Sequence, residues 1–415
     1  MNNYDNAKGI YIHIPFCVQK CIYCDFNSSA GCSKTEIENY FKDLYKEADI
    51  YLSIIKDISE NTAEAASIIA DTIFIGGGTP TSVDSRYIKG LIEKFRITDG
   101  IEVTIEANPG TITPEKLADY RACGINRISM GVQSFQDEEL RFLGRIHSAD
   151  EACRSFEMAR QAGFHNINID LIFGFPGHNM ESWKKTLKTV IELSPEHISF
   201  YSLQIEEGTK MYQLFREGMV DQVPDEVNRE MYHYAVNVLK EAGYDHYEIS
   251  NAAKPGYQCR HNLKYWSMTP YIGLGAGAHS YLSRNRFFNP DSLIKYHEAV
   301  EEKAVAADYD DGEAIGTSEY SEGDIYIKEI MSSGTEVFEN TLEDEVTDYL
   351  FTGLRRICGI ELDDFRRRFG FTFYEKYGGK IQDFIKDGFM EENSGWLRFT
   401  EKGLDITNYI LTELM

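Results

Sequence analysis

The sequence predicts an α/β fold: a partial (β/α)6 TIM-like barrel followed by a small, mainly helical domain that resembles a winged helix. Three observations lead to it. Six short runs rich in β-branched residues alternate with amphipathic stretches over residues 9–203. Alternation of strands and helices at this spacing is typical of parallel βαβ units. The first unit carries no dinucleotide-binding glycine fingerprint, which favours a barrel over a Rossmann sheet.

The elements follow in order along the chain. The predicted strands are Gly9–Pro15, Thr72–Gly76, Glu102–Asn108, Arg127–Val132, Asn166–Ile172 and His197–Leu203. The predicted helices between them are Thr35–Ile55, Ser85–Phe95, Pro114–Cys123, Ala149–Ala162 and Met180–Leu193. Thr113 before Pro114 indicates a helix start, because threonine caps helices and proline suits the first helical position. In such barrels the chemistry lies at the C-terminal ends of the strands.

We expect three parts in the chain: the barrel in residues 1–285, a connecting segment in 286–335 and the C-terminal domain in 336–415. Glu301 to Asp324 is acidic, contains glycine and has little apolar periodicity, which predicts an exposed excursion. The predicted C-terminal helices are Asp344–Ile357, Leu362–Phe369 and Tyr374–Asp387. Trp396–Thr400 followed by Glu401–Gly403 is interpreted as a short β-wing.

Composition narrows the function classes. The net charge is −25, which opposes binding to nucleic acid or to anionic membranes. No signal peptide and no apolar run of about 18 residues is recognisable. Eight cysteines in 415 residues do not form a disulfide framework and indicate a reducing compartment. We therefore expect a cytoplasmic protein without a transmembrane segment, which reaches a membrane only transiently and through partners.

Cys17, Cys21 and Cys24 are the most informative residues, with the spacing C-x3-C-x2-C. Three thiolates can hold three corners of a [4Fe–4S] cluster and leave one iron open to another ligand. The alternative is a zinc site completed by His13 or Cys32, because structural zinc takes four ligands.

Polar groups recur where the predicted strands end. Gly76-Gly77-Gly78-Thr79 follows the second strand, and glycines there let a ligand approach the backbone. Further polar residues belong to the next strands: Glu106, Gln133, Ser134 and Asp170, with Arg145 on the helix after the fourth strand. Unpaired buried polar groups cost roughly 1–3 kcal/mol each, so their convergence on one ring favours a common ligand.

These motifs resemble the radical S-adenosylmethionine superfamily, and within it the oxygen-independent coproporphyrinogen III oxidase branch. The segments that carry the likeness are IHIPFC, GGGTPT, RISMGVQSF and DLIFGFPG. The resemblance implies that S-adenosylmethionine binds the open iron.

It also implies roles for individual residues. Tyr11 would contact S-adenosylmethionine at the open iron, and Tyr23 would lie beside the cluster. The remaining residues of that predicted site are Gly77, Gly78 and Thr79 at the methionyl end, Glu106 at the ribose, and Gln133, Arg145 and Asp170 in the same mouth.

His261-Asn262-Leu263-Lys264-Tyr265-Trp266 is a second motif, H-N-x-x-Y-W, and it resembles that of the HemW family of heme chaperones. Imidazole is a strong ligand for heme iron, so His261 is the leading candidate. Cys259 is the second candidate and His279 the third. Gln204 and His279 are expected to face a ligand cavity. The resemblance implies heme as cargo, heme-acceptor proteins as partners and a homodimer as a plausible assembly.

The oxidases of this branch carry a cysteine where this chain has Phe26, and they have a longer N-terminal extension. Both departures argue against coproporphyrinogen oxidase activity. The sequence therefore predicts a heme chaperone on a radical S-adenosylmethionine scaffold, with the oxidase as the alternative. A radical methyltransferase or cyclase is the third interpretation.

Overall fold

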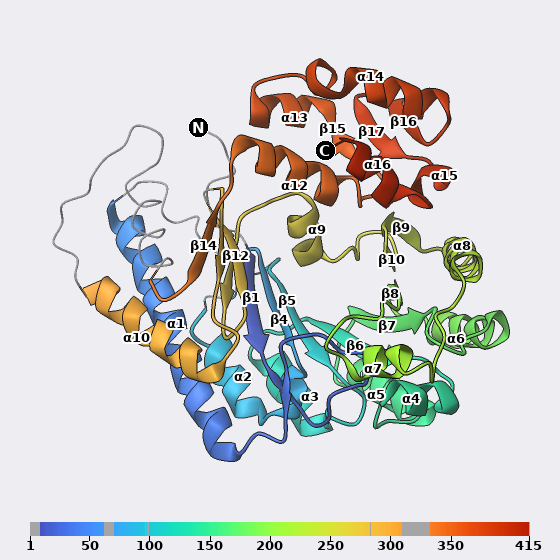
Figure 1. Ribbon diagram of the computed structural model, residues 1–415. Coiled ribbons are helices and arrows are strands. Elements are labelled where there is room, and N and C mark those ends of the chain that lie inside the picture. The colour runs from blue at the N-terminus through green and yellow to red at the C-terminus, as the bar shows by residue number, and fades with distance from the viewer. Residues whose placement is uncertain are drawn as a thin grey trace.

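The computed structural model describes residues 9–61, 70–95, 97, 99–282, 284–308 and 333–414. Its centre is a sheet of six parallel strands in sequence order, as predicted (Figure 1). They are β1 (Gly9–Ile14), β4 (Thr72–Gly77), β5 (Glu102–Ala107), β6 (Arg127–Gln133), β7 (Ile167–Phe173) and β8 (His197–Ser202). Each lies within one or two residues of the predicted strand. The predicted α/β fold is confirmed.

The strands divide their side chains between two environments. In β6, Ile128, Met130 and Val132 are fully buried in the main hydrophobic core beneath the outer helices. The alternate residues, such as Arg127 and Ser129, face the concave side of the sheet and line cavities there. Side chains alternate along a strand, so apolar and polar positions separate onto the two faces. This concave side is the lumen of the partial barrel.

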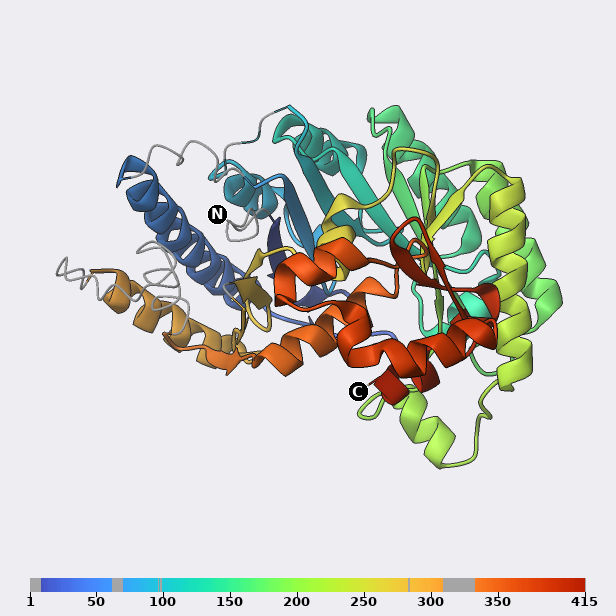
Figure 2. The ribbon, with the colours of Figure 1, turned by 90° about the horizontal axis from the view of Figure 1, so that it is seen from above.

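Helices cover the convex side (Figures 1 and 2). They are α1 (Lys34–Asn61), α2 (Ser85–Ile92), α3 (Pro114–Ala122), α4 (Asp137–Leu143), α5 (Ala149–Gln161), α6 (Met180–Leu193) and α8 (Asp225–Glu241). Side-chain caps mark the starts of α2, α3, α5 and α6, whereas α4 and α8 begin without one. Thr113 accepts from the Lys116 backbone N–H, and Ser148 forms a capping box with Glu151. Such caps stabilise a helix by about 1 kcal/mol each.

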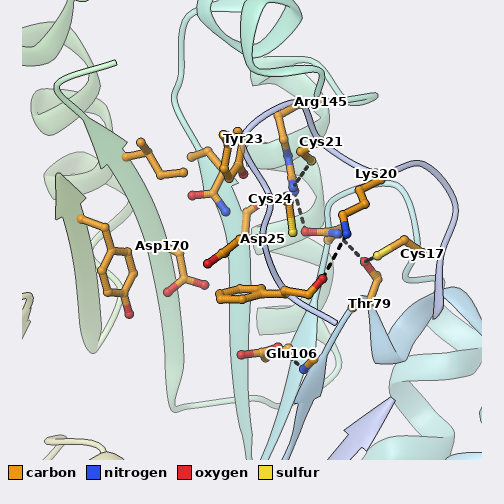
Figure 3. A pocket seen from close by; sticks show the side chains of 18 of the residues that line it. Cys17, Lys20, Cys21, Tyr23, Cys24, Asp25, Thr79, Glu106, Arg145 and Asp170 are labelled. Atoms are coloured by element: carbon orange, nitrogen blue, oxygen red, sulfur yellow. Dashed lines mark hydrogen bonds between the residues drawn. The ribbon is translucent and has the colours of Figure 1, made fainter. Parts of the chain in front are cut away.

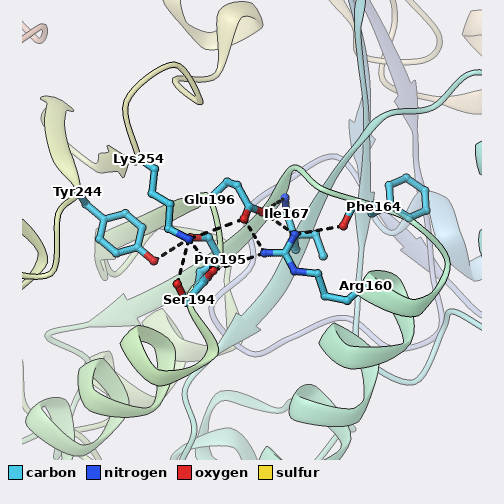
Figure 4. Close-up of polar contacts among 8 residues, drawn as sticks. All are labelled: Arg160, Phe164, Ile167, Ser194, Pro195, Glu196, Tyr244 and Lys254. Carbon is cyan, nitrogen blue, oxygen red and sulfur yellow. Dashed lines mark hydrogen bonds and ion pairs between the residues drawn. The ribbon is translucent and has the colours of Figure 1, made fainter.

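Figure 4 shows a polar cluster that ties α5 to the starts of β7 and β8. Glu196 pairs with Arg160 at 2.7 Å and accepts from the Ile167 backbone N–H at 3.1 Å. Lys254 donates to the Ser194 carbonyl at 2.8 Å. These contacts lie at the N-terminal ends of the strands, the side of such barrels that serves stability.

Short strands widen the sheet on both sides, and the sequence did not predict them. β11 (Tyr271–Leu274) pairs in parallel with β1, and β12 (His279–Leu282), β13 (Asn285–Phe288) and β14 (Glu336–Glu339) follow antiparallel. On the other side β10 (Asn251–Ala253) and β9 (Asp245–Glu248) extend β8. The described sheet therefore has twelve strands.

α10 (Leu293–Asp308) runs beside α1, as both ribbon views show (Figures 1 and 2). Lys303 of α10 and Glu47 of α1 form a buried ion pair at 2.6 Å between them. Residues 301–308 of the predicted acidic excursion are therefore helical, and 309–324 lie outside the described residues. Apolar side chains of residues 285–308 pack into the main hydrophobic core. The predicted domain boundaries at residues 285 and 336 stay a prediction.

A second core forms near the C-terminus from α12 (Leu342–Gly353), α13 (Leu362–Phe369), α14 (Phe373–Lys386), α15 (Glu401–Leu404) and α16 (Thr407–Leu414). A small sheet in the order β15 (Ile360–Glu361), β17 (Trp396–Phe399), β16 (Met390–Asn393) completes it. The wing is thus β16 and β17 joined at residues 394–395. The prediction that Glu401–Gly403 belongs to the wing is wrong, because Thr400 caps a helical turn there.

None of the helices that the structure describes combines the length and the apolar character that a membrane crossing requires.

Candidate functional site

The three cysteines lie on the loop after β1, at the mouth of the barrel. The short strand β2 (Phe16–Cys17) pairs with β3 (Ser29–Ala30), and a turn joins the Cys24 N–H to the Cys21 carbonyl at 3.3 Å. All three thiols line one cavity of about 360 Å³ (Figure 3). Within the described ranges no three His, Cys, Asp or Glu side chains are arranged to hold a single metal ion.

Each glycine of the triplet after β4 makes room for one neighbour. A Cβ on Gly76 would lie 3.0 Å from the Glu106 carboxyl, and one on Gly77 would lie 2.7 Å from the His13 ring. On Gly78 it would approach the Cys17 sulfur to 3.0 Å. Contacts below about 3 Å force a shift, so a larger residue in place of Gly78 would displace the cysteine loop. The triplet therefore seats the cysteine loop against β4.

Arg145 joins the cysteine loop to the strands. Its guanidinium donates to the Cys21 sulfur at 3.3 Å, to the Asn108 side-chain oxygen at 2.5 Å and to the Gly131 carbonyl at 2.5 Å. Its Nε has no partner among the described residues. Asn108 in turn donates to Thr79 at 2.7 Å, so one network connects four loops around the cavity.

Gln133 shows backbone strain at this site. Its φ is 74°, in the left-handed region that costs a non-glycine residue roughly 1–2 kcal/mol. The register between β6 and β7 shifts at the same place. Its buried side-chain oxygen has no partner in the described part of the chain. Strained residues with unpaired polar atoms cluster where ligands bind.

Glu106 and Asp170 face the cavity from β5 and β7 (Figure 3). Burial, together with the nearby Asp170 carboxylate, raises the pKa of Glu106 to about 8. Burial also raises the pKa of Asp170. At neutral pH the Glu106 carboxyl is therefore protonated, able to donate a hydrogen bond as well as to accept one.

The structure brings twelve of the fifteen predicted site residues to this one cavity, the "cluster cavity". They are Cys17, Cys21, Tyr23, Cys24, Gly77, Gly78, Thr79, Glu106, Gln133, Arg145, Asp170 and Gln204. Tyr11, His261 and His279 do not line it. Tyr11 lies deeper, with its hydroxyl 2.9 Å from Nδ1 of His13, so its predicted contact at the open iron has no support here.

His261 closes the opposite end of the barrel. Helix α9 (Arg260–Trp266) plugs that end, and Glu102 of β5 accepts from the Arg260 and His261 N–H groups at 3.1 and 3.0 Å. The His261 ring is fully buried, with Nδ1 2.9 Å from the Thr72 hydroxyl and Nε2 2.9 Å from the Tyr265 hydroxyl. Neither ring nitrogen is free to bind iron in this arrangement. The leading role predicted for His261 is not supported.

Cys259 also lies out of reach. It is fully buried, and burial raises the pKa of its thiol to about 12. His279 differs from both because its side chain is exposed. It lines a second cavity of about 420 Å³, together with Tyr11, His13, Phe26 and Tyr271. Burial and the nearby Arg286 lower the pKa of His279, which keeps its imidazole neutral, the form that binds metals.

The loop before His279 is held rigidly. Glu47 accepts from the Gly275 N–H at 2.8 Å, and Tyr40 accepts from the Ala276 N–H at 3.2 Å. Gly277 has φ 73°, and a Cβ there would lie 2.4 Å from the Asn27 amide. The glycines of this segment thus serve close packing against the cysteine loop, in keeping with the absence of a dinucleotide fingerprint.

Comparison with known proteins gives the family. The Radical SAM superfamily profile matches residues 11–190, and the HemN C-terminal domain profile matches 340–406. The heme chaperone HemW of Bacillus subtilis is 33% identical over 409 residues, which cover 97% of this chain and 98% of that protein. This chain belongs to the HemW family.

Other relatives agree with HemW membership. The heme chaperone HemW of Escherichia coli is 41% identical over 275 residues, 65% of this chain and 69% of that protein. The structure of the Escherichia coli coproporphyrinogen III oxidase HemN aligns with a TM-score of 0.75, covering 99% of this chain and 90% of that one. At 21% identity it shows a shared fold alone.

The site includes residues that the sequence interpretation missed. Asn108, Tyr201 and Glu206 line the cluster cavity, as does Lys20, which donates to the Phe26 carbonyl at 3.1 Å. Asn108 had a usable signal, because it follows Glu106 by two residues and so faces the same way at the end of its strand. Tyr201 and Glu206 had none, because an aromatic residue or a carboxylate after a strand is common.

Proposed function

We propose that this protein carries heme in the cavity lined by His279 and delivers it to acceptor proteins. We further propose that it holds a [4Fe–4S] cluster and S-adenosylmethionine in the cluster cavity. Two observations support this: the convergence of three thiols and nine further predicted residues on one cavity, and an exposed imidazole in the adjoining one. Phe26, Gly77 and Glu106 line both cavities, so the two adjoin.

The residues of the cluster cavity fit the proposed cofactors. Cys17, Cys21 and Cys24 would ligate three irons, and a bound cluster supplies one-electron chemistry at an iron left open for S-adenosylmethionine. Arg145 balances charge at the sulfurs, and the Gln133 amide and Glu106 carboxyl offer hydrogen bonds to a polar ligand. Replacing Cys21 with Ser should abolish the iron and sulfide content. A full complement in that variant would refute the assignment.

For heme, we propose His279 as the iron ligand. Its side chain is exposed in a cavity whose walls include the rings of Tyr11, Phe26 and Tyr271, and flat aromatic walls suit a porphyrin. Phe288 supports the imidazole edge-on, with ring centroids 4.4 Å apart. The exposed Phe26 stands at the border of the two cavities, where it would shield heme from the cluster side.

Hemin titration tests the ligand assignment with two matched histidine variants. His279→Ala should weaken the Soret band and raise the hemin Kd by at least about tenfold, since even supporting residues of metal sites contribute that much. His261→Ala should keep the hemin affinity of the parent protein. The reverse pattern would restore His261 as the ligand, and no hemin binding by the parent protein would end the chaperone proposal.

The oxidase alternative has its own test. The reconstituted protein is incubated with S-adenosylmethionine, a reductant and coproporphyrinogen III. We expect no protoporphyrinogen IX, and its formation at catalytic turnover would contradict a chaperone-only function.

A further inference from the structure

A third cavity, of about 220 Å³, lies in the barrel lumen between the cluster cavity and the α9 plug. Arg127 of β6 and Asn262 of α9 line it, together with Tyr201 and Ser199. It shares Glu106 and Asp170 with the cluster cavity, and Tyr11, Glu106 and Tyr265 with the His279 cavity. This "lumen cavity" therefore adjoins both of the other cavities.

Arg127 makes the lumen cavity unusual. Its side chain is 1% exposed, and its Nε has no hydrogen-bond partner in the described ranges. No ion pair or hydrogen bond of its guanidinium is found among the described residues, although Glu102 and Asp170 lie near enough to interact electrostatically. A buried arginine is costly unless its N–H groups find acceptors. The geometry leaves donors of this guanidinium available to a ligand.

Three carboxylate oxygens around the lumen cavity already accept hydrogen bonds. The two Asp170 oxygens accept from Asn168 at 2.7 Å and from Ser129 at 3.2 Å. Glu106 accepts from the Gly77 N–H at 3.0 Å. Because burial raises the pKa of Glu106 to about 8, its carboxyl is neutral at pH 7 and does not repel an anion. The unused hydrogen-bonding capacity is therefore mainly donor capacity, from Arg127 and the Asn262 amide.

We propose that the lumen cavity binds a carboxylate arm of the ligand, through the Arg127 guanidinium and the Asn262 amide. This rests on the proposed heme function, because the propionate side chains of heme are the carboxylates that a heme in the His279 cavity would extend. Guanidinium and carboxylate match in shape and charge, and such pairs are frequently bidentate. The H-N-x-x-Y-W motif thus contributes to heme binding through Asn262, while its histidine closes the floor.

The test compares hemin with hemin dimethyl ester, in which both propionates are neutral. The parent protein should bind hemin about 10- to 100-fold more tightly than the ester, the effect of a buried charge-assisted hydrogen bond. In Arg127→Gln the preference should fall to about fivefold or less, the share left to the Asn262 amide. The control is Arg260→Gln, an exposed arginine on α9 outside the cavity, which should keep the full preference.

Each outcome separates the two proposals. No hemin binding by the parent protein overturns the proposed function, whereas equal binding of hemin and its ester overturns only the carboxylate site. If Arg127→Gln keeps the full preference for hemin over its ester, the carboxylate site is also overturned. If circular dichroism shows that Arg127→Gln does not fold, Asn262→Ala is the deciding variant. Its preference for hemin over the ester should fall about fivefold, the effect of one hydrogen bond. An unchanged preference in Asn262→Ala refutes the site.

A free small carboxylate is the other source of this chemistry. If the site serves one, sodium propanoate should raise the Tm of the heme-free parent protein but not that of Arg127→Gln, while hemin and its ester bind equally. That result would overturn the assignment to heme propionates.

Discussion

Two histidines at the floor of the barrel and two polar side chains at its mouth, held by the same sheet, differ in their hydrogen bonding. At the floor, His261 uses both ring nitrogens and His197 contacts Asn168 at 2.6 Å and Tyr247 at 2.7 Å. At the mouth, the Gln133 oxygen and the Arg145 Nε have no partner among the described residues. Buried polar groups that are hydrogen-bonded stabilise a fold, whereas a buried polar atom without a partner is destabilising until a ligand pairs with it. Whether a histidine in a sequence motif can bind a ligand therefore depends on whether its ring nitrogens already have hydrogen-bond partners in the fold.

The largest expected effect tests the structural role of the floor. Glu102→Ala removes the buried carboxylate that accepts from the start of α9 and lies near Arg127. The free energy of unfolding should fall by about 2–5 kcal/mol, because the two backbone N–H groups at the start of α9 lose their acceptor. Urea unfolding measures it. The exposed Glu138→Ala should change stability by no more than about 0.5 kcal/mol, and equal effects would show that the floor is not stabilising.

A smaller effect of opposite sign is expected at the mouth. Gln133→Gly should raise the free energy of unfolding by up to about 1 kcal/mol, because glycine tolerates the φ of 74° and the unpaired amide is removed. Gln213→Gly in α7 (Lys210–Arg216) is the control. It should lose about 0.5–1 kcal/mol, as glycine does in helices. A loss in both variants would mean that the mouth stores no strain.

The smallest effect is the pH dependence of the cofactor-free protein. Glu106 titrates near pH 8 when folded and near pH 4.5 in its ordinary state, so the folded chain holds one more proton between these values. Its contribution to stability therefore falls as pH rises from about 4.5 to 8 and then levels off. Glu106→Gln should show a flatter fall of Tm across this window. If the curves of Tm against pH were parallel for the parent protein and Glu106→Gln, the pKa of Glu106 would not be raised by folding.

The strands and the cluster cavity could be predicted because their signals are local. The residue types of a run such as Arg127–Gln133 are enough to predict a strand. Residues that follow the strands then meet at one edge in any parallel barrel. β9–β14 escaped prediction because they have three or four residues each and owe their existence to partners far along the chain. His261 was ranked above His279 because a motif gives residue type, whereas burial depends on the packing of α9 against β4.

The sheet order has a consequence for synthesis. β1, which leads into the cysteine loop, completes its pairing only when β11 arrives, and β11 leads to His279. The roughly 250 residues between them take about 12–50 s to translate at about 5–20 residues per second. During that interval one edge of β1 stays open, and the thiols are accessible before the wall that carries His279 exists. We therefore expect a nascent chain to be ready for an iron–sulfur donor well before it can hold heme.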